Sequence, residues 1–348
     1  MSYKGNGSGA TILVTGGGGY TGCVVTERLL ARGYSVRVLD RLWWGEEPLA
    51  AVRDRIELIV ADVREVPNTA LDGVDAVIHL AGLANDPTAE HDPEANWDIT
   101  VLATADLASS CLERGIERFV YASSASLYDG LERGVHAESA AIEPRGAYAT
   151  AKHEAELRLH ELVGDGLQPV IFRNATLFGF SPRMRFDLVV HTFLKDALMS
   201  GELYLHGGGR MARPLADVRD AADAMIAAVE ARAEVVGGEV FNVLHSNYQI
   251  RELAMIVAGS LQMVGWPVRL TEMPAPQLNR SYALSNRKLV DRLGFVPRYS
   301  VLDGVSDLLE NLDLTSPARY AHPRYYNLGW LQLLEELSPR FERFSTVL

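Results

Sequence analysis

Hydrophobic and polar positions alternate in a regular way along the first half of the chain. Short apolar runs predict buried strands at Thr11–Thr15, Ser35–Asp40, Ile56–Ala61, Ala76–Leu80 and Phe119–Ala122. Between them, apolar residues at helical spacing predict helices such as Tyr20–Arg32, which ends before Gly33, and Thr100–Arg114. Such strand–helix repetition is typical of an α/β protein with a parallel sheet, and right-handed crossovers make that sheet doubly wound.

The pattern loosens after a sixth predicted strand at Pro169–Phe172. A helix is predicted at Asp187–Ser200, and a clear helix and strand return at Asp217–Ala231 and Glu239–Val243. From His245 onward the sequence predicts helices and loops.

This pattern suggests a division of the chain into a larger and a smaller unit. We expect a cofactor domain over residues 11–178, to which 214–244 return. A smaller, mostly C-terminal α/β substrate lobe is expected from 179–213 and 245–348, with a C-terminal extension. Residues 1–10 are polar and rich in Gly and Ser, as in a flexible lead-in.

Composition and charge exclude several classes of function. The 348 residues are 48% hydrophobic and 22% charged, with a formal net charge of −12. Long blocks of Lys or Arg are absent, so no nucleic-acid partner is expected. The two cysteines, Cys23 and Cys111, fall in predicted helices and are expected to be reduced, and no Cys/His spacing predicts a metal site. Without a signal peptide or a run of membrane-spanning length, we expect a cytoplasmic protein with no membrane partner.

A glycine-rich turn joins the first predicted strand to the first predicted helix. It satisfies G-x-G-x-x-G at Gly17, Gly19 and Gly22, and T-G-x-x-G-x-x-G at Thr15, Gly16, Gly19 and Gly22. Glycines let the backbone approach a diphosphate closely, and N–H groups at a helix start bind it. Between a strand and a helix, this pattern predicts a Rossmann-type dinucleotide-binding domain.

Residues at the ends of the next predicted strands extend this cofactor site. A carboxylate at Asp40 is placed to accept the adenosine ribose hydroxyls, which favours NAD over NADP, although Arg41 follows directly and suits a 2′-phosphate. A strand-end cap is the alternative interpretation of Asp40. Asp62 is placed to meet the adenine amino group, and a turn explains it equally well. His79, within an apolar strand, is interpreted as a core histidine.

A second set of residues points to proton transfer. Tyr148 and Lys152 form Y-x-x-x-K on a stretch of helical character, Tyr148–Leu162, so both lie on one helix face. A nearby ammonium is expected to lower the tyrosine pKa, which suits proton exchange with a sugar hydroxyl. Ser124 lies at the end of the fifth strand, where ligands of open parallel sheets bind. Taken singly, Tyr148 and Lys152 also fit a solvent-exposed pair on a helix, and Ser124 also fits a serine-rich turn at the end of a strand. Their order in the chain after the glycine turn favours a catalytic role.

With these motifs together, the chain resembles the extended short-chain dehydrogenase/reductases, specifically the NAD-dependent epimerase/dehydratase family of nucleotide sugars. The resemblance covers roughly residues 11–310. It rests on VTGGGGYTG, Asp40, HLAG (79–82), YASSASLY (121–128), YATAK (148–152), Arg173 with Phe178-Gly179, RPLADVRD (213–220) and NRSYALSNRKL (279–289).

The resemblance implies a role for each matching residue. The implied catalytic set is Ser124, Tyr148 and Lys152. The implied cofactor-binding residues are Gly16, Gly19, Tyr20, Thr21, Gly22, Asp40, Arg41, Asp62, Val63, Leu80, Ala81, Gly82, Tyr148 and Lys152. The substrate-binding candidates are Ser126, Thr176, His191, Arg213 and Arg280, of which the two arginines stand where the family grips the substrate diphosphate. Surface salt bridges are the alternative for the arginines.

Departures from the family pattern narrow the expected reaction. Sugar 4,6-dehydratases carry an Asp-Glu pair where this chain has Ala125 and Ser126, and UDP-glucuronate decarboxylases carry a Glu at Ser126. Thr100, Thr176 and His191 replace Asn residues common in the family. We therefore expect an NAD-dependent epimerase of a nucleotide-diphosphate sugar that works through a transient keto sugar at C4. The alternatives are an NAD(P)-dependent ketosugar reductase or dehydrogenase, and a non-catalytic dinucleotide sensor.

Two further expectations concern surfaces. The family resemblance implies a homodimer through the helices at Thr100–Arg114 and Tyr148–Leu162. The tail after Leu312 extends beyond the usual end of the family, and its aromatic and basic residues are interpreted as ordinary packing in preference to cover of a site. These residues are Arg319, Tyr320, Tyr325, Tyr326 and Trp330.

Overall fold

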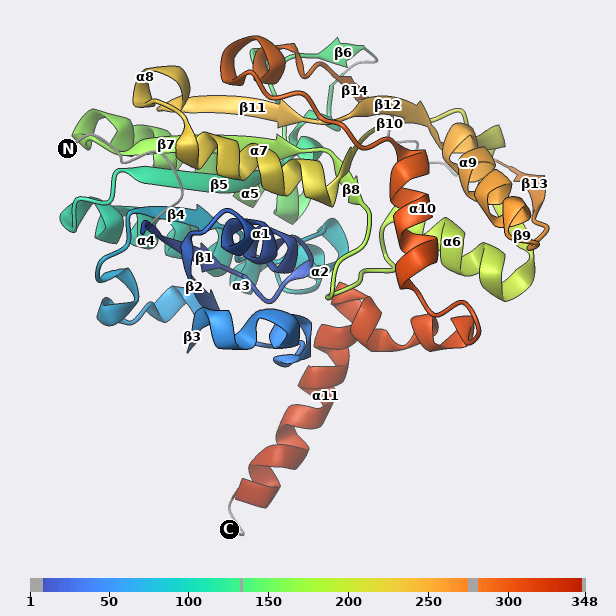
Figure 1. Cartoon of the computed structure of the whole chain (residues 1–348), viewed down its shortest axis with the longest axis horizontal. Coiled ribbons are helices and arrows are strands. Elements are labelled where there is room, and N and C mark those ends of the chain that lie inside the picture. Colours follow the sequence, from blue (N-terminus) through green and yellow to red (C-terminus); the bar gives the residue numbers. More distant parts are fainter. Residues whose placement is uncertain (1–8, 132–133, 275–280, 346–348) are drawn as a thin grey trace.

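The centre of the protein is a parallel sheet of seven strands, in the order β11-β7-β5-β4-β1-β2-β3 (Figure 1). The computed structural model describes residues 9–131, 134–274 and 281–345, with side chains described as far as Ser338. The strands are β1 (Thr11–Thr15), β2 (Ser35–Asp40), β3 (Ile56–Val60), β4 (Ala76–His79), β5 (Arg118–Ser124), β7 (Gln168–Asn174) and β11 (Glu239–Val243). The strand order reverses beside β1, so the predicted Rossmann-type doubly wound fold is confirmed.

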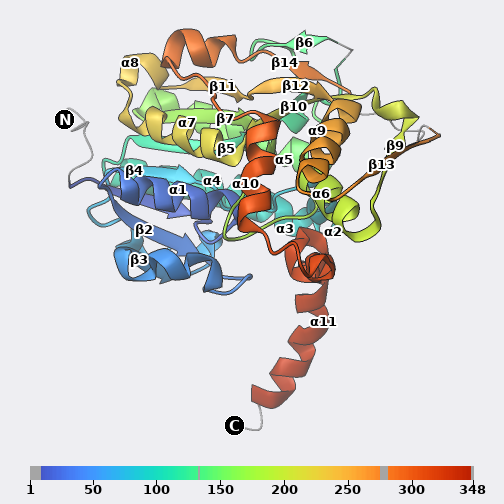
Figure 2. The same cartoon turned by 45° about the vertical axis from the view of Figure 1, so that its right-hand side comes forward.

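Helices cover both faces of this sheet, as Figures 1 and 2 show. One face carries α1 (Tyr20–Ala31) and α7 (Val218–Glu230). The other carries α3 (Pro93–Trp97), a π-helical turn η4 (Asp98–Leu102), α4 (Ala103–Glu113) and α5 (Gly146–Glu161). Strand β1 contributes side chains to the cores on both faces of the sheet. Ile12 and Val14 pack in the core that contains Leu29 of α1, whereas Leu13 packs with Leu107 of α4.

The large strands and helices lie within a few residues of their predicted bounds, but the short strands were missed. Strand β5 runs to Ser124 because the polar Ser123 and Ser124 still pair with Arg173 and Asn174 of β7. The prediction of only helices and loops after His245 was wrong. Strands β12 (Ser246–Gln249), β13 (Arg269–Met273) and β14 (Ala283–Leu284) form there. β12 and β13 are rich in polar residues and β14 has only two residues, and each of the three pairs with a distant segment, which a local pattern does not reveal.

A second group of strands and helices comes from segments far apart in the chain. Its members are β6 (Val135–His136), β8 (Thr176–Phe178), α6 (Val189–Ser200), β9 (Glu202–His206), β10 (Ala212–Asp217), α8 (Ala233–Val236), α9 (Ile250–Met263) and α10 (Val301–Asn311). Strand β10 pairs with β8 and β12, β9 with β13, and β6 with β14. Helix α10 seats on β8 at Gly304, where a Cβ atom would stand 2.5 Å from the Phe178 ring.

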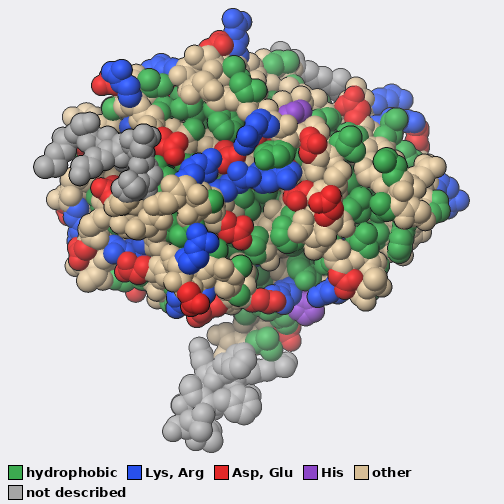
Figure 3. All heavy atoms as spheres, viewed as in Figure 1, with side chains coloured by type: hydrophobic (Ala, Val, Ile, Leu, Met, Phe, Trp, Pro, Cys, Tyr) green, Lys and Arg blue, Asp and Glu red, His purple; other side chains and the backbone are tan. Residues whose placement is uncertain are grey.

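One buried carboxylate ties the two helices of the front face together. In Figure 3, basic side chains gather over α1 and α7 among acidic ones. Asp223 of α7, only 3% exposed, accepts from Arg28 at 2.6 Å, Arg32 at 2.7 Å and Arg298 at 3.0 Å. Because the carboxylate is buried and shared, it fixes α1 against α7 and against the chain before α10.

The C-terminal segment packs beside the loop that follows β2. Helix α11 (Asn327–Ser345) projects away from the body (Figures 1 and 2). Near its start, the Trp330 indole N–H donates to the Trp43 carbonyl at 2.7 Å, and the Trp44 indole N–H donates to the Arg324 carbonyl at 3.1 Å. Across the described residues, no helix is both long enough and apolar enough to cross a membrane.

The remaining helical elements are short. They are α2 (Asp86–His91), a π-helical turn η8 (Leu289–Leu293), and the 3-10 turns η1 (Glu47–Arg55), η2 (Val63–Glu65), η3 (Asn68–Leu71), η5 (Ala125–Tyr128), η6 (Leu162–Asp165), η7 (Gly207–Gly209), η9 (Pro317–Ala321) and η10 (Pro323–Tyr325). Both cysteines are free and buried.

Candidate active site

A cavity of about 540 Å³ opens at the carboxyl ends of the parallel strands, next to the point where the strand order reverses. Every residue of the predicted cofactor set and of the predicted catalytic set lines it. The cavity thus brings together residues from the turns after β1 and β4 and from β2, β5, α1 and α5, which are spread over more than a hundred positions of the chain.

The glycine turn is shaped by close backbone contacts. A Cβ atom at Gly22 would stand 2.1 Å from the Gly16 carbonyl oxygen, and one at Gly16 would stand 2.7 Å from the Ala81 nitrogen. Gly16 also has a φ of 70°, which favours glycine. Gly19 caps α1 without a side-chain hydrogen bond, and the first turn holds no acidic residue. The turn therefore has the form that a diphosphate requires, and it fits a dinucleotide cofactor.

The adenosine end of the predicted cofactor site is acidic and internally bonded. Asp40 accepts from the Gly18 N–H at 2.9 Å and from the Leu42 N–H at 2.7 Å, and burial raises its pKa. Asp62 binds the guanidinium groups of Arg41 and Arg64, each at 2.7 Å, and its hydrogen bonds with Arg64 lower its pKa to about 2. Both carboxylates line the cavity, and Arg41 is already paired with Asp62.

His79 lies beneath this site as a core residue. It is fully buried, with Nδ1 2.6 Å from the Thr15 hydroxyl and Nε2 2.8 Å from the Thr104 hydroxyl. Because Thr104 donates its own proton to the Thr100 carbonyl, it accepts from Nε2, which assigns the proton to that nitrogen. Burial lowers the His79 pKa to about 3, so the ring stays neutral, in line with the core interpretation.

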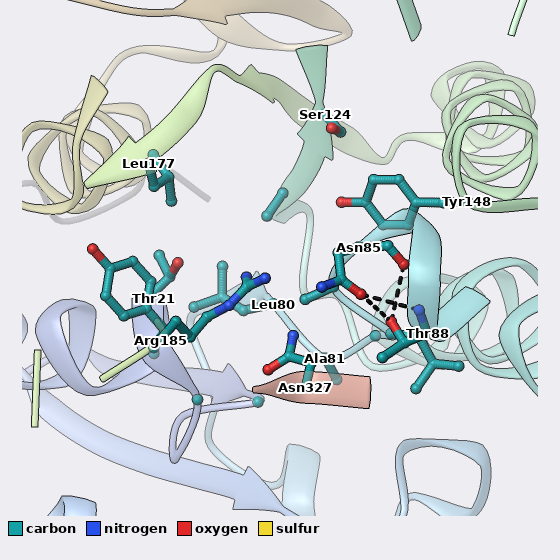
Figure 4. A pocket seen from close by; sticks show the side chains of 18 of the residues that line it. Thr21, Leu80, Ala81, Asn85, Thr88, Ser124, Tyr148, Leu177, Arg185 and Asn327 are labelled. Carbon is teal, nitrogen blue, oxygen red and sulfur yellow. Dashed lines mark hydrogen bonds between the residues drawn. The ribbon is translucent and has the colours of Figure 1, made fainter. Parts of the chain in front are cut away.

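Ser124, Tyr148 and Lys152 all line the cavity, and Figure 4 shows the first two. The Lys152 ammonium donates to the Ala122 carbonyl at 2.8 Å and lies 4.7 Å from the centre of the Tyr121 ring. Tyr148 points its hydroxyl into the cavity from α5, and Ser124 lies across from it at the end of β5. A hydrogen bond joins the Ser124 and Tyr148 side chains.

Beneath this group, a buried ion pair fixes α5 to the sheet. Glu156, one turn after Lys152, accepts from Ser123 at 2.5 Å and from Arg173 at 2.6 Å. Arg173 also donates to the Tyr128 hydroxyl at 2.8 Å. These bonds lock the ends of β5 and β7 against the helix that presents Tyr148.

The expected lowering of the Tyr148 pKa by Lys152 is wrong for this structure. Burial is the largest influence and raises the Tyr148 pKa, while the Ser124 hydrogen bond and the charge of Arg185 lower it. Burial also lowers the Lys152 pKa to about 8, against the opposing charge of Glu156. The ammonium instead bonds to the Ala122 carbonyl, and the cation that favours the Tyr148 phenolate is Arg185.

The predicted substrate residues do not all reach the cavity. Ser126, Thr176 and Arg213 line it, and the Arg213 guanidinium lies 5.5 Å from the centre of the Tyr282 ring. Arg280 lies outside the described residues. His191 is fully buried away from the cavity and therefore contacts no ligand there.

The ring of His191 serves the fold instead. Its Nε2 accepts from the Gly179 N–H at 3.1 Å, and its Nδ1 lies 2.6 Å from the Arg185 carbonyl oxygen, to which it donates. Burial lowers its pKa to about 4. Both nitrogens are used to shape the loop before α6.

Polar residues that the sequence did not single out also line the cavity. They are Asn85, Arg183, Arg185, Asp187 and Asn327. Arg185 donates two hydrogen bonds of 2.9 Å to Asp187, which also accepts from Asn85 at 2.7 Å. Figure 4 shows Arg185 and Asn327 pointing into the cavity beside Thr21 and Ala81. The two arginines of the FSPRMRFD run were the available signal, whereas Asn327 gave none.

The C-terminal tail therefore borders the site, which corrects its interpretation as ordinary packing. Both Asn327 and Leu331 of α11 line the cavity. The aromatic residues just before them pack as expected, since Tyr320 stacks on Phe186 with ring centres 4.6 Å apart.

Comparison with known proteins gives a consistent result. Residues 12–243 match the NAD dependent epimerase/dehydratase family. The chain is 27% identical over 315 residues to a UDP-glucose 4-epimerase of Mycolicibacterium smegmatis, covering 86% of this chain and 97% of that protein. Among solved structures, it is similar to DesIV, a dTDP-glucose 4,6-dehydratase of Streptomyces venezuelae with NAD bound. That similarity has a TM-score of 0.75 and 25% identity and covers 86% of this chain and 97% of that one.

A further solved structure supports the fold. The UDP-glucuronic acid 4-epimerase of Bacillus cereus, in complex with NAD, matches with a TM-score of 0.75 at 22% identity, covering 85% of this chain and 94% of that one. The family match spans more than half of the chain, and the glycine turn and strand-end residues fit the cofactor that the family uses. The chain belongs to the NAD-dependent epimerase/dehydratase family and is an NAD-dependent enzyme of the extended short-chain dehydrogenase/reductase type.

Proposed function

We propose that the protein is an epimerase of a nucleotide-diphosphate sugar, which oxidises a sugar carbinol at C4 to a keto sugar and reduces it again on the opposite face. The observation that carries this proposal is that Ser124, Tyr148 and Lys152 border the same cavity as the glycine turn. The residues that transfer a proton and the turn that binds the dinucleotide would therefore contact ligands bound in the same cavity.

The roles of the side chains follow from their surroundings. Tyr148, as phenolate, takes the proton of the sugar hydroxyl and later returns it, and Ser124 holds the reacting oxygen through its hydroxyl. Arg185 supplies the positive charge that favours the phenolate, and Lys152, which also lines the cavity, binds the cofactor. Bound NAD supplies the acceptor, and afterwards the donor, of one hydride.

The substrate side of the cavity offers unsatisfied polar atoms. Within the described part of the chain, Ser126 Oγ and Asn174 Oδ1 are buried without a hydrogen-bond partner, and both residues line the cavity. A sugar hydroxyl bound there would satisfy both atoms, which otherwise cost free energy. Ala125 and Ser126 hold no carboxylate, which supports epimerisation over dehydration, since loss of water needs extra proton transfers.

The substrate class is proposed from the relatives and from charge. The relative from Mycolicibacterium smegmatis is a UDP-glucose 4-epimerase, and Arg213 lines the cavity beside Tyr282. A guanidinium there is suited to the diphosphate of a UDP-sugar.

The test is a panel of nucleotide sugars with purified protein and NAD, followed by NMR and by NADH absorbance together. A new sugar diastereomer without lasting NADH supports the proposal and identifies the substrate. Stoichiometric NADH contradicts it and favours a dehydrogenase or a reductase running in reverse. Tight NAD binding with no reaction on any sugar contradicts it as well and favours a dinucleotide sensor.

We also propose a homodimer through η4, α4 and α5, the helices at Thr100–Arg114 and Tyr148–Leu162. Large apolar side chains are exposed along this face, where Trp97, Leu102 and Leu157 are 39%, 50% and 44% exposed. Burial of these side chains against a second copy would remove apolar surface from water. Sedimentation of the wild type and of Leu157→Glu tests this, and a monomeric wild type refutes it.

A further inference from the structure

Arg183 is a buried cation whose described contacts are all neutral. It lies in the loop between β8 and α6, lines the cavity, and is only 4% exposed. Its guanidinium lies 4.0 Å from the centre of the Trp44 ring, and one Nη donates to the Asn327 amide oxygen at 2.6 Å. Its Nε has no hydrogen-bond partner among the described residues.

The neighbouring arginines of the cavity differ from Arg183 in having carboxylate partners. Arg41 binds Asp62 at 2.7 Å, and Arg185 binds Asp187 at 2.9 Å. Within the described residues, Arg183 forms no ion pair. Burial and the charge of Arg185 lower its pKa to about 9. A guanidinium held in this way is costly to bury, and an anion bound in the cavity would offset that cost.

The loop that carries Arg183 is bonded directly to the first turn of α1. Ser181 Oγ donates to the Tyr20 carbonyl at 2.7 Å, and the Tyr20 hydroxyl donates to the Gly179 carbonyl at 2.8 Å. The Arg183 N–H also bonds to the Cys23 thiol. Arg183 and the glycine turn, whose backbone N–H groups form the phosphate cradle, therefore border the same space.

We propose that Arg183 binds the diphosphate of the dinucleotide together with the glycine turn, and that Asn327 of the C-terminal segment positions it. The inference rests on NAD as the cofactor and not on which sugar reacts. A planar guanidinium suits phosphate oxygens, and the Trp44 ring keeps it in one plane.

The attachment of the C-terminal segment supports the role of Asn327. Trp44 donates to the Arg324 carbonyl and Trp330 donates to the Trp43 carbonyl, so the chain on both sides of Asn327 is bonded to the loop after β2. Asn327 is itself 4% exposed. An amide oxygen orients the guanidinium without neutralising it, which leaves the positive charge for a ligand.

The experiment compares NAD, NADP, ADP, UDP and adenosine by isothermal titration to full-length protein freed of nucleotide. Arg183→Met removes the charge and keeps an apolar contact with Trp44. Arg287→Met is the matched control, because Arg287 is 85% exposed and lies outside the cavity. We expect Arg183→Met to weaken NAD and ADP about 10- to 100-fold and to leave adenosine unchanged, with wild-type binding in the control.

Asn327→Asp provides an independent variant that keeps the shape of the side chain. The new carboxylate would give Arg183 the partner that it lacks and would compete with the diphosphate. We expect NAD to bind about tenfold more weakly while the unliganded protein unfolds at an equal or higher temperature. NAD affinity and unfolding temperature are both measured without turnover, so the result does not depend on which sugar the enzyme uses.

Several outcomes would overturn the inference. Unchanged NAD and ADP affinity in Arg183→Met removes the proposed contact, and an equal loss for adenosine shows a general disturbance of the cavity. A loss that appears only with UDP, or only with NADP, assigns Arg183 to the substrate diphosphate or to a 2′-phosphate. If Arg183→Met does not fold, unchanged NAD binding in Asn327→Asp still refutes the proposal.

Discussion

The two walls of the cofactor cavity are built in opposite ways. The wall of the glycine turn comes from one short stretch of chain, and it offers backbone N–H groups that close contacts hold in place. The second wall joins Trp44, Arg183 and Asn327, which are far apart in sequence, and it offers one charged side chain. Local backbone geometry tolerates almost no change, whereas an assembly of side chains should lose function in steps. Substitutions in each wall should separate these two behaviours, and Tyr148 belongs to neither wall.

Tyr148→Phe should abolish turnover without affecting either wall. The phenolic proton carrier is lost, so we expect kcat to fall about 10²- to 10⁴-fold. NAD affinity should stay within about twofold of the wild type, because the ring remains. Turnover is measured by NMR on the substrate found in the panel, and NAD affinity by titration. Full turnover in the variant would refute the proposed mechanism.

Gly22→Ala should remove the cofactor almost completely. The new Cβ would meet the Gly16 carbonyl oxygen at 2.1 Å and the Gly17 Cα at 2.6 Å, and these backbone atoms cannot move aside without opening the turn. We expect NAD affinity to fall about 100-fold or more. Gly259→Ala is the control, because nothing lies within 4 Å of its Cβ position in α9, and alanine should stabilise that helix. Only a small loss in Gly22→Ala would contradict the rigidity assigned to this wall.

Arg185→Met should change the pH dependence of the reaction. Without this cation the Tyr148 phenolate is less favoured, so the Tyr148 pKa rises further and the rising limb of kcat/KM moves to higher pH. At pH 7 we expect kcat/KM to fall about tenfold. Arg185→Lys retains the charge and should keep the limb in place. If the rising limb of the kcat/KM profile lies at the same pH in the wild type, Arg185→Met and Arg185→Lys, Arg185 has only a structural role.

Trp330→Phe should give the smallest effect, on the side-chain wall. The variant loses the indole hydrogen bond to the Trp43 carbonyl, which contributes about 1 kcal/mol, so NAD affinity should fall about two- to fivefold. Trp266→Phe is the matched control. A loss as large as that of Gly22→Ala would mean that the two walls do not differ in the proposed way.

The same contrast explains what the sequence revealed. The glycine turn, Asp40 and Tyr148 could be located because consecutive or regularly spaced residues specify them. Arg183 could not, because its importance depends on burial, on the Trp44 ring and on the absence of a carboxylate, which only the folded chain shows. The prediction that His191 binds substrate was wrong. A motif position does not show whether both ring nitrogens already form hydrogen bonds within the fold.

The elements of the fold differ in the same way in how far the sequence predicts them. The long apolar strands and helices are visible in the local pattern, whereas β13 acquires its partner, β9, more than sixty residues away. The tail was interpreted as ordinary packing because its aromatic residues do pack. The contribution of Asn327 depends on a single hydrogen bond across the cavity.

The bridge from Asp223 to α1 has a consequence for the order in which the protein is made. Arg28 and its carboxylate partner are 195 positions apart, and the sheet is complete only when β11 joins β7. During synthesis the glycine turn leaves the ribosome first, while the helix behind it lacks the partner helix that will support it and β7 keeps an open edge. Translation of the segment from α7 to β11 therefore sets the earliest moment at which a newly made chain can hold its cofactor.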